Sequence, residues 1–181
     1  RQYDNIRKFV RYLLSSNAGE VVAILANLLM GGPLILLPVQ ILWMNLVTDS
    51  VTALALGAEP AEEGLMERPP RRPDEPIVGA RGLLSVVLLG LYIGVATLWL
   101  FHHFRTEHGA RGVFVAQTVA FTGIILLEKM NVFNFRSLEV PMSPRRFFAN
   151  RWLLAAWAGM IALQVAVVYV PRSSGRSTPS R

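Results

Sequence analysis

The sequence predicts an all-α integral membrane protein with five transmembrane helices. Two observations carry this prediction, namely the composition and the length of the apolar runs. Hydrophobic residues make up 52% of the 181 residues and charged residues 17%, and the mean hydropathy is +0.40, which is too apolar for an ordinary soluble domain. The chain has no cysteine, so disulfide bonds and thiolate metal sites are excluded.

Five apolar runs each reach the length that a helix needs to cross a membrane. At ~1.5 Å per residue, roughly 20 residues span a hydrocarbon layer of ~30 Å. The runs are Leu13 to Met30, Pro38 to Gly57, Gly82 to Phe104, Val113 to Phe135 and Trp152 to Val170. They divide the chain into a charged lead-in that extends the first helix into water (1–12), a helical hairpin (13–57), a loop (58–81), a second helical pair (82–135), a loop (136–151), a fifth span (152–170) and a tail expected to be disordered (171–181).

Glycine and proline residues indicate where these helices end and where they meet. Residues 31–33 read Gly-Gly-Pro and end the first helix, and Pro38 begins the second, which leaves a tight, uncharged connection. In the third run, Gly90 and Gly94 have the G-x-x-x-G spacing that lets another helix approach closely. We expect the first run, with its Gly19, to be that partner.

The basic residues predict the orientation in the lipid bilayer. Arginine and lysine residues concentrate in the lead-in, in loop 58–81 and in loop 136–151. The positive-inside rule places these segments, and therefore the N-terminus, on the cytoplasmic side. The same residues do not follow one polar face, so we expect no nucleic-acid partner despite the net charge of +6. The excess of Arg over Lys fits a GC-rich bacterial gene and hence the bacterial plasma membrane.

Three acidic residues lie well inside the predicted spans. Glu20, Asp49 and Glu128 are each surrounded in sequence by apolar residues. An ionised side chain at the centre of a membrane helix costs about 3 kcal/mol on insertion scales, so the three together cost about 9 kcal/mol. An interaction inside the protein must offset this cost.

Polar companions accompany all three acids. Asn17 precedes Glu20 by three residues, Asn45 and Thr48 precede Asp49 by four and one, and Asn131 follows Glu128 by three. At 100° per residue, each group falls within one arc of its helix. The candidate metal ligands are therefore Asn17, Glu20, Asn45, Thr48, Asp49 and Glu128.

Carboxylate, amide and hydroxyl oxygens without His or Cys are the ligands of a hard cation. Calcium takes about 6 to 8 oxygen ligands, and manganese, sodium and protons are alternatives that suit the same donors. Three carboxylates around one divalent ion leave one negative charge over, which favours a shared proton or a proton that returns in exchange. The competing interpretation is that the amides and hydroxyls join the helices, with the acids neutral or paired with a basic residue.

Three segments resemble one known family. RQYDNIRKFVRYLLSSNAGEVV, LPVQILWMNLVTDSVTALALG and LMERPPRRPDEPIV look like the C-terminal membrane half of a P-type cation-transporting ATPase, in particular the calcium pumps of the sarco/endoplasmic reticulum kind and their bacterial relatives. The resemblance implies that the five runs are the fifth to ninth helices of a ten-helix domain. It also implies that the lead-in is part of a cytoplasmic stalk.

The resemblance assigns the same six residues as cation ligands. It places Asn17 and Glu20 on the fifth helix, Asn45, Thr48 and Asp49 on the sixth, and Glu128 on the eighth. It further implies that Asp49 bridges two ion sites, the second of which needs a glutamate from a fourth helix that this chain does not contain.

Two residues depart from the family pattern. Ser50 stands where the calcium pumps usually carry glycine, which we expect to tighten the turn near Asp49. Lys129 follows Glu128, and its position 100° further round the helix favours an outward, snorkelling pose. If Lys129 turned inward, its ammonium group would act as a built-in counterion and displace one bound cation.

The function that follows is the ion-binding transmembrane part of an ATP-driven pump that exports calcium and returns protons. The chain has no DKTG phosphorylation motif, so this chain alone cannot hydrolyse ATP. Mg-ATP and the phosphorylation, nucleotide and actuator domains, together with the first four helices, would belong to the parent pump. Two alternatives stay open: a non-catalytic membrane remnant or interaction module that binds cations without transport, and an ion channel or secondary transporter.

Overall fold

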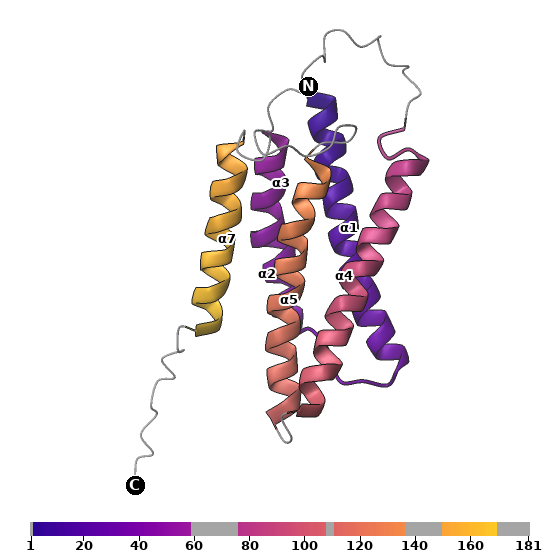
Figure 1. The fold of residues 1–181 in the computed structure, drawn as a ribbon, viewed down its shortest axis with the longest axis vertical. Helices are drawn as coiled ribbons and strands as arrows, with labels where there is room; N and C mark the ends of the chain where they lie inside the picture. The colour runs from indigo at the N-terminus through magenta and orange to yellow at the C-terminus, as the bar shows by residue number, and fades with distance from the viewer. Residues whose placement is uncertain (1, 59–75, 108–110, 137–149, 170–181) are drawn as a thin grey trace.

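The computed structural model describes residues 2–58, 76–107, 111–136 and 150–169, all of which form helices or short connections (Figure 1). The helical elements are α1 (Gln2–Leu29), α2 (Pro38–Trp43), η1 (Met44–Asp49), α3 (Ser50–Gly57), α4 (Ala80–Glu107), α5 (Gly112–Phe135) and α7 (Arg151–Tyr169). The predicted tail 171–181 and most of the predicted loops 58–81 and 136–151 lie outside the described residues.

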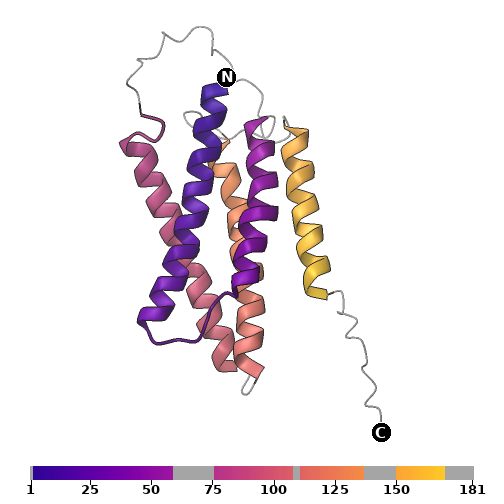
Figure 2. The same cartoon turned by 180° about the vertical axis from the view of Figure 1, so that it is seen from behind.

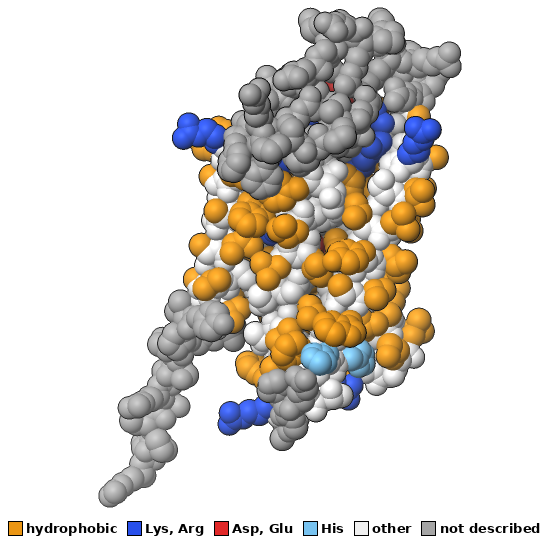
Figure 3. Space-filling model, in the orientation of Figure 1, with side chains coloured by type: hydrophobic (Ala, Val, Ile, Leu, Met, Phe, Trp, Pro, Cys, Tyr) orange, Lys and Arg blue, Asp and Glu red, His pale blue; other side chains and the backbone are white. Residues whose placement is uncertain are grey.

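Within the described residues, five helices are long and apolar enough to cross a membrane, as the sequence predicts. They are Gln2–Leu29, Pro38–Gly57, Ala80–Thr106, Gly112–Phe135 and Arg151–Val168, and the second is formed by α2, η1 and α3 in succession. Hydrophobic side chains cover the middle of the face shown in Figure 3, and large Lys and Arg side chains extend near its two ends. The prediction of an all-helical membrane protein is therefore confirmed.

The helix boundaries follow the residues that the sequence marks as breakers. Helix α1 runs without interruption from the charged lead-in into the apolar run. It ends before Gly31, whose φ of 68° lies in the left-handed region that glycine adopts at helix ends. Pro38 occupies the first turn of α2, where the side chain of Gln40 accepts a hydrogen bond from the Leu37 N–H at 2.8 Å.

Helices α1 and α4 cross in direct contact, with α1 and α3 on the near side in the reverse view (Figure 2). Glycines make this contact possible, as predicted. A Cβ atom on Gly94 would lie 2.8 Å from the Gly19 carbonyl oxygen and 2.6 Å from the Val22 side chain, and one on Gly90 would lie 2.7 Å from the Ala18 Cβ. The backbones therefore approach more closely than larger residues would allow.

Two apolar clusters divide the bundle along its length. The first contains Ala23 of α1 and Ile124 of α5, and the second contains Tyr12 of α1 and Val132 of α5. Residues between these positions on both helices therefore lie at an intermediate level. Glu20 of α1 and Glu128 of α5 occupy this level, between the two apolar clusters.

Among the five candidate spans of the described residues, α7 has the smallest buried share. It stands at one side of the bundle in both ribbon views and contacts α3 and α5 (Figures 1 and 2). Only 11% of its most apolar window is buried. Asn150 anchors its start, because its side chain donates a hydrogen bond to the Ala55 carbonyl at 3.1 Å and accepts one from the Leu153 N–H at 2.9 Å.

Candidate cation site

The three acids that the sequence singles out come together inside the helix bundle. One carboxylate oxygen from each of Glu20, Asp49 and Glu128 lies within 4.8 Å of the other two. Two ligands of one calcium ion at ~2.3–2.6 Å lie no more than about 5 Å apart, so this spacing fits a single ion. Three helical elements, α1, η1 and α5, each supply one of the acids.

The acids are buried and largely unsatisfied. Glu20 is 5% exposed, and Asp49 and Glu128 are 0% exposed. Within the described residues, neither carboxylate oxygen of Glu128 accepts a hydrogen bond, and one oxygen of Glu20 and one of Asp49 also lack a donor. Buried polar atoms normally have partners, so four carboxylate oxygens that lack a donor, on three acids whose carboxylates cluster together, indicate a place for a cation.

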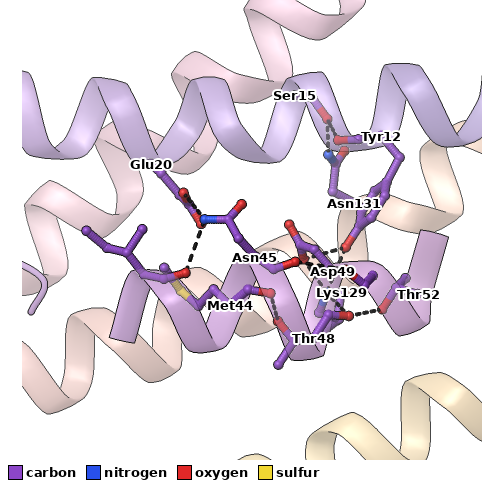
Figure 4. A network of polar contacts seen from close by, with 12 residues as sticks. Tyr12, Ser15, Glu20, Met44, Asn45, Thr48, Asp49, Thr52, Lys129 and Asn131 are labelled. Atoms are coloured by element: carbon purple, nitrogen blue, oxygen red, sulfur yellow. Dashed lines mark hydrogen bonds and ion pairs between the residues drawn. The ribbon is translucent and has the colours of Figure 1, made fainter. Parts of the chain in front are cut away.

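The amide of Asn45 joins this cluster from η1. Its Nδ2 donates to one oxygen of Glu20 at 2.9 Å and to the Ile41 carbonyl at 3.1 Å (Figure 4). Both donated bonds leave the amide oxygen available as an acceptor. Asn45 therefore fixes the Glu20 carboxylate and can itself contribute an oxygen to the site.

Thr48 and Asn17 are placed differently. Thr48 is 1% exposed, and its hydroxyl donates to the Met44 carbonyl of its own helix at 2.9 Å. Asn17 is exposed, and it lies on a stripe of α1 that also carries the exposed Leu14, Val21 and Leu25. The structure thus does not bring Asn17 to the cluster formed by these helices, and its role as a ligand stays a prediction.

The segment that carries Asn45, Thr48 and Asp49 is a π-helix, which the sequence did not predict. The sequence argument placed these residues at 100° intervals, and that spacing does not hold for η1, because a π-helix pairs residues five apart rather than four. The Ser50 hydroxyl donates to the Asn45 carbonyl, five residues earlier, at 3.0 Å. Single π turns within α-helices occur frequently at functional sites.

Lys129 points inward, and the expectation of a snorkelling pose is wrong. The residue is 0% exposed, and its Nζ lies 2.6 Å from Asp49 Oδ1. The angular argument failed because α5 is enclosed over a broad face. Glu128, Lys129, Asn131 and Val132 are all buried there, so an offset of 100° from Glu128 still faces protein.

The ammonium group of Lys129 is fully satisfied. Besides Asp49, it donates to the Tyr12 hydroxyl at 2.7 Å and to the Thr48 carbonyl at 3.1 Å, and the Tyr12 hydroxyl in turn donates to Asp49 Oδ1 at 3.0 Å (Figure 4). Tyr12 is not among the candidate residues that the sequence singles out. Its place one turn before Ser15 and Ser16, on the same helix as Glu20, is the signal that could have identified it.

A second polar link extends from the cluster along α1 and α5. The Asn131 amide donates to the Ser15 hydroxyl at 2.7 Å, and that hydroxyl donates to the Tyr12 carbonyl at 2.8 Å (Figure 4). Asn134 donates to the Asn131 side-chain oxygen at 3.0 Å. These bonds hold α1 and α5 in register near the acids.

Comparison with known proteins identifies the family. A family model described as "Cation transporting ATPase, C-terminus" matches residues 33–176. The chain belongs to this family. The resemblance inferred from the sequence motifs is therefore confirmed, and the five helices are part of the C-terminal transmembrane region of a P-type cation ATPase.

Individual relatives agree with this assignment. The chain is 42% identical over 172 residues to a calcium-transporting ATPase of Bacillus subtilis and 32% identical over 201 residues to an endoplasmic reticulum calcium ATPase of Aspergillus fumigatus. It is 35% identical over 169 residues to a probable cation-transporting ATPase F of Mycobacterium bovis. Each match covers 93% of this chain but only 18% to 20% of the relative, so the chain spans about a fifth of the length of these relatives.

Proposed function

We propose that this chain is the ion-binding transmembrane part of a longer ATP-driven pump that exports calcium. The observation that carries the proposal is the buried cluster of the Glu20, Asp49 and Glu128 carboxylates, in which each acid keeps at least one oxygen without a hydrogen-bond donor among the described residues. Burying them without a counterion would cost several kcal/mol per charge. A cation bound among them during transport offsets that cost.

The donor types favour calcium over a transition metal. Carboxylate oxygens dominate the cluster, Asn45 adds an amide, and no sulfur or imidazole lies among the residues that form it. Calcium accepts such oxygens at variable coordination number and also takes water and backbone carbonyls. Relatives named as calcium-transporting ATPases support the same ion.

Completing the ligand shell would require helices from outside this chain. The exposed stripe of α1 that carries Asn17 presents an amide where no described helix packs. Helices from the rest of the parent pump would cover this stripe and bring Asn17 into the shell. The phosphorylation, nucleotide and actuator domains, with Mg-ATP, would supply the driving reaction.

Transport would proceed by alternating access. Movement of the stalk part of α1 would shift Glu20 relative to Asp49 and open the carboxylate cluster to the outside. Carboxylates that lose a divalent ion inside a membrane need a replacement charge, so protons would return on the same groups. The basic lead-in and loops 58–81 and 136–151 would face the cytoplasm of a bacterial plasma membrane, with the N-terminus inside.

The test is ATP-dependent uptake of radiolabelled calcium by inside-out vesicles that contain the full-length pump. We expect uptake with an accompanying export of protons from the vesicle lumen, and loss of uptake in Glu20→Gln. The Ser85→Ala variant is the control, because this hydroxyl only donates to the Arg81 carbonyl of its own helix. Calcium binding without any ATP-dependent uptake would instead favour a non-transporting module.

A further inference from the structure

Lys129 has the contacts of a bound cation rather than those of a structural lysine. Its Nζ is surrounded by three oxygens, Asp49 Oδ1 at 2.6 Å, the Tyr12 hydroxyl at 2.7 Å and the Thr48 carbonyl at 3.1 Å. An ammonium group has three N–H donors, and each finds one acceptor here. The oxygens come from α1 and η1, whereas the lysine enters from α5.

These three oxygens would form a cation position even without the lysine. A carboxylate oxygen, a hydroxyl and a backbone carbonyl are hard ligands, and carbonyl oxygens also coordinate potassium in channels. The Thr48 carbonyl lies in the π-helical segment, where it accepts bonds from both Lys129 and the Thr52 hydroxyl. The position is closed from solvent, because Tyr12, Asp49 and Lys129 are each 0% exposed.

The charges agree with this interpretation. With all four groups ionised, the carboxylates of Glu20, Asp49 and Glu128 and the ammonium of Lys129 together carry a net charge of −2. One divalent cation balances this charge, and a second would leave an excess of positive charge in the membrane interior, which is costly. Lys129 also contacts Asp49 Oδ1, so of the two Asp49 oxygens only Oδ2 lacks a hydrogen-bond partner among the described residues.

We propose that Lys129 is a tethered cation that permanently fills one of two cation positions at Asp49, so that the pump carries one divalent ion per cycle. This inference rests on the proposed function, because it specifies how the same site is occupied. Glu128 contributes its carboxylate to the transported ion, and its neighbour Lys129 excludes a second ion. Tyr12 acts as a positioning residue, since its hydroxyl contacts both Lys129 and Asp49.

The test is to count the ions bound by the purified full-length pump. In equilibrium dialysis with radiolabelled calcium and rubidium, each wild-type pump molecule that can be phosphorylated should bind one calcium ion and no rubidium ion. Rubidium is used because a potassium-sized ion resembles an ammonium group in radius. Lys129→Met should bind one calcium and gain one rubidium ion, because the vacated position keeps its three oxygens. Lys129→Arg, which keeps the charge, should gain none.

The results that would overturn the tethered-cation proposal differ from the result that would reject the proposed function. Two calcium ions per wild-type pump would overturn the tethered-cation proposal even if the Lys129→Met protein fails to fold, and would leave calcium pumping intact. A folded Lys129→Met protein that binds no rubidium would also overturn it. Absence of any calcium binding to the wild-type pump would instead reject the proposed function.

Discussion

Asp49 makes two different kinds of contact, one through each carboxylate oxygen. Oδ1 is held by Lys129 and Tyr12, whereas Oδ2 is buried without a partner among the described residues. A buried ion pair is a weak source of net stability, but removing one partner leaves an uncompensated charge. Stability and cation binding therefore depend on the same residue through different atoms.

Asp49→Asn should lower both properties. Loss of the charge partner of Lys129 should reduce the free energy of unfolding by as much as about 3 kcal/mol, and loss of a charged ligand should weaken calcium binding by roughly tenfold or more. Heat-induced aggregation in detergent measures the first effect and calcium titration measures the second. Unchanged calcium affinity would remove Asp49 from the site.

The double variant Asp49→Asn/Lys129→Met separates the two effects. It removes both charges of the pair, so the protein should recover most of the lost thermal stability. Calcium affinity should stay low, because the ligand oxygen is still missing its charge. Recovery of both properties would mean that Asp49 serves only to neutralise Lys129.

For single residues, the sequence predicts which acids form the site better than it predicts the contacts around them. The insertion cost of an isolated charge is a local quantity, so Glu20, Asp49 and Glu128 could be selected without a structure. The inward pose of Lys129 depends on how many helices enclose α5, and the exposed pose of Asn17 depends on which helices pack against α1. Neither fact is encoded in the helical angle of one residue relative to its neighbour.

Among the elements, α1 and α4 form a contact that tolerates little added volume. Their glycines bring the backbone of one helix within van der Waals distance of the other, and backbone atoms cannot move aside as a flexible side chain can. The sequence predicted this contact because G-x-x-x-G spacing is a local pattern with one common structural use.

Gly94→Ala should destabilise the bundle by about 1 to 3 kcal/mol, because the new Cβ would overlap Val22 and the Gly19 carbonyl. Gly159→Ala on α7 is the matched control, since no atom of the described residues lies within 4 Å of its Cβ position, apart from its chain neighbours and the backbone of its own helix. There the substitution should be neutral or stabilise by up to about 1 kcal/mol through helix propensity. Thermal denaturation in detergent compares the two, and equal effects would argue against close α1–α4 packing.

The π-helix η1 could not be predicted in the same way. Its residues, MNLVTD, contain neither proline nor glycine, and their apolar pattern fits an ordinary helix. The wide turn depends on tertiary contacts such as the bonds from Lys129 to the Thr48 carbonyl and from Asn45 to Glu20. These partners lie on other helices, so the sequence of η1 alone does not specify it.

Ser50→Ala should weaken calcium binding by a few-fold, because one hydrogen bond that spans the wide turn is worth about 1 kcal/mol. Ser85→Ala removes a bond of the same length, 3.0 Å, in the regular helix α4 and should leave calcium affinity unchanged. Calcium titration of both variants is the measurement. Equal affinities would show that the Ser50 bond does not shape the site.

For the molecule as a whole, the apolar composition and run lengths were sufficient to predict five membrane helices, because the bilayer constrains length and polarity directly. The predicted orientation rests on the basic residues of the lead-in and of loops 58–81 and 136–151, and it can be tested with single cysteines, since the chain has none of its own. Ile77 and Met30 are 44% and 63% exposed. Ile77 lies near the start of α1, because its carbonyl accepts a hydrogen bond from Arg7 at 3.1 Å, whereas Met30 follows the last residue of α1, at the opposite end of that helix.

In a full-length pump freed of other cysteines, Met30→Cys should react with a membrane-impermeant maleimide in intact cells, whereas Ile77→Cys should react only after the cells are opened. This result follows if the Arg-rich end faces the cytoplasm. The reverse labelling pattern would invert the proposed orientation and the direction of transport.

The most direct measurement of the cation site is calcium binding to the full-length pump carrying Glu128→Gln. Both oxygens of Glu128 are buried and accept no hydrogen bond from the described residues, so the site predicts a loss of affinity on the order of tenfold to a hundredfold. The control is Thr118→Val, since this α5 hydroxyl only bonds to the Phe114 carbonyl of its own helix. Wild-type affinity in a folded Glu128→Gln pump would contradict a cation site among these three acids.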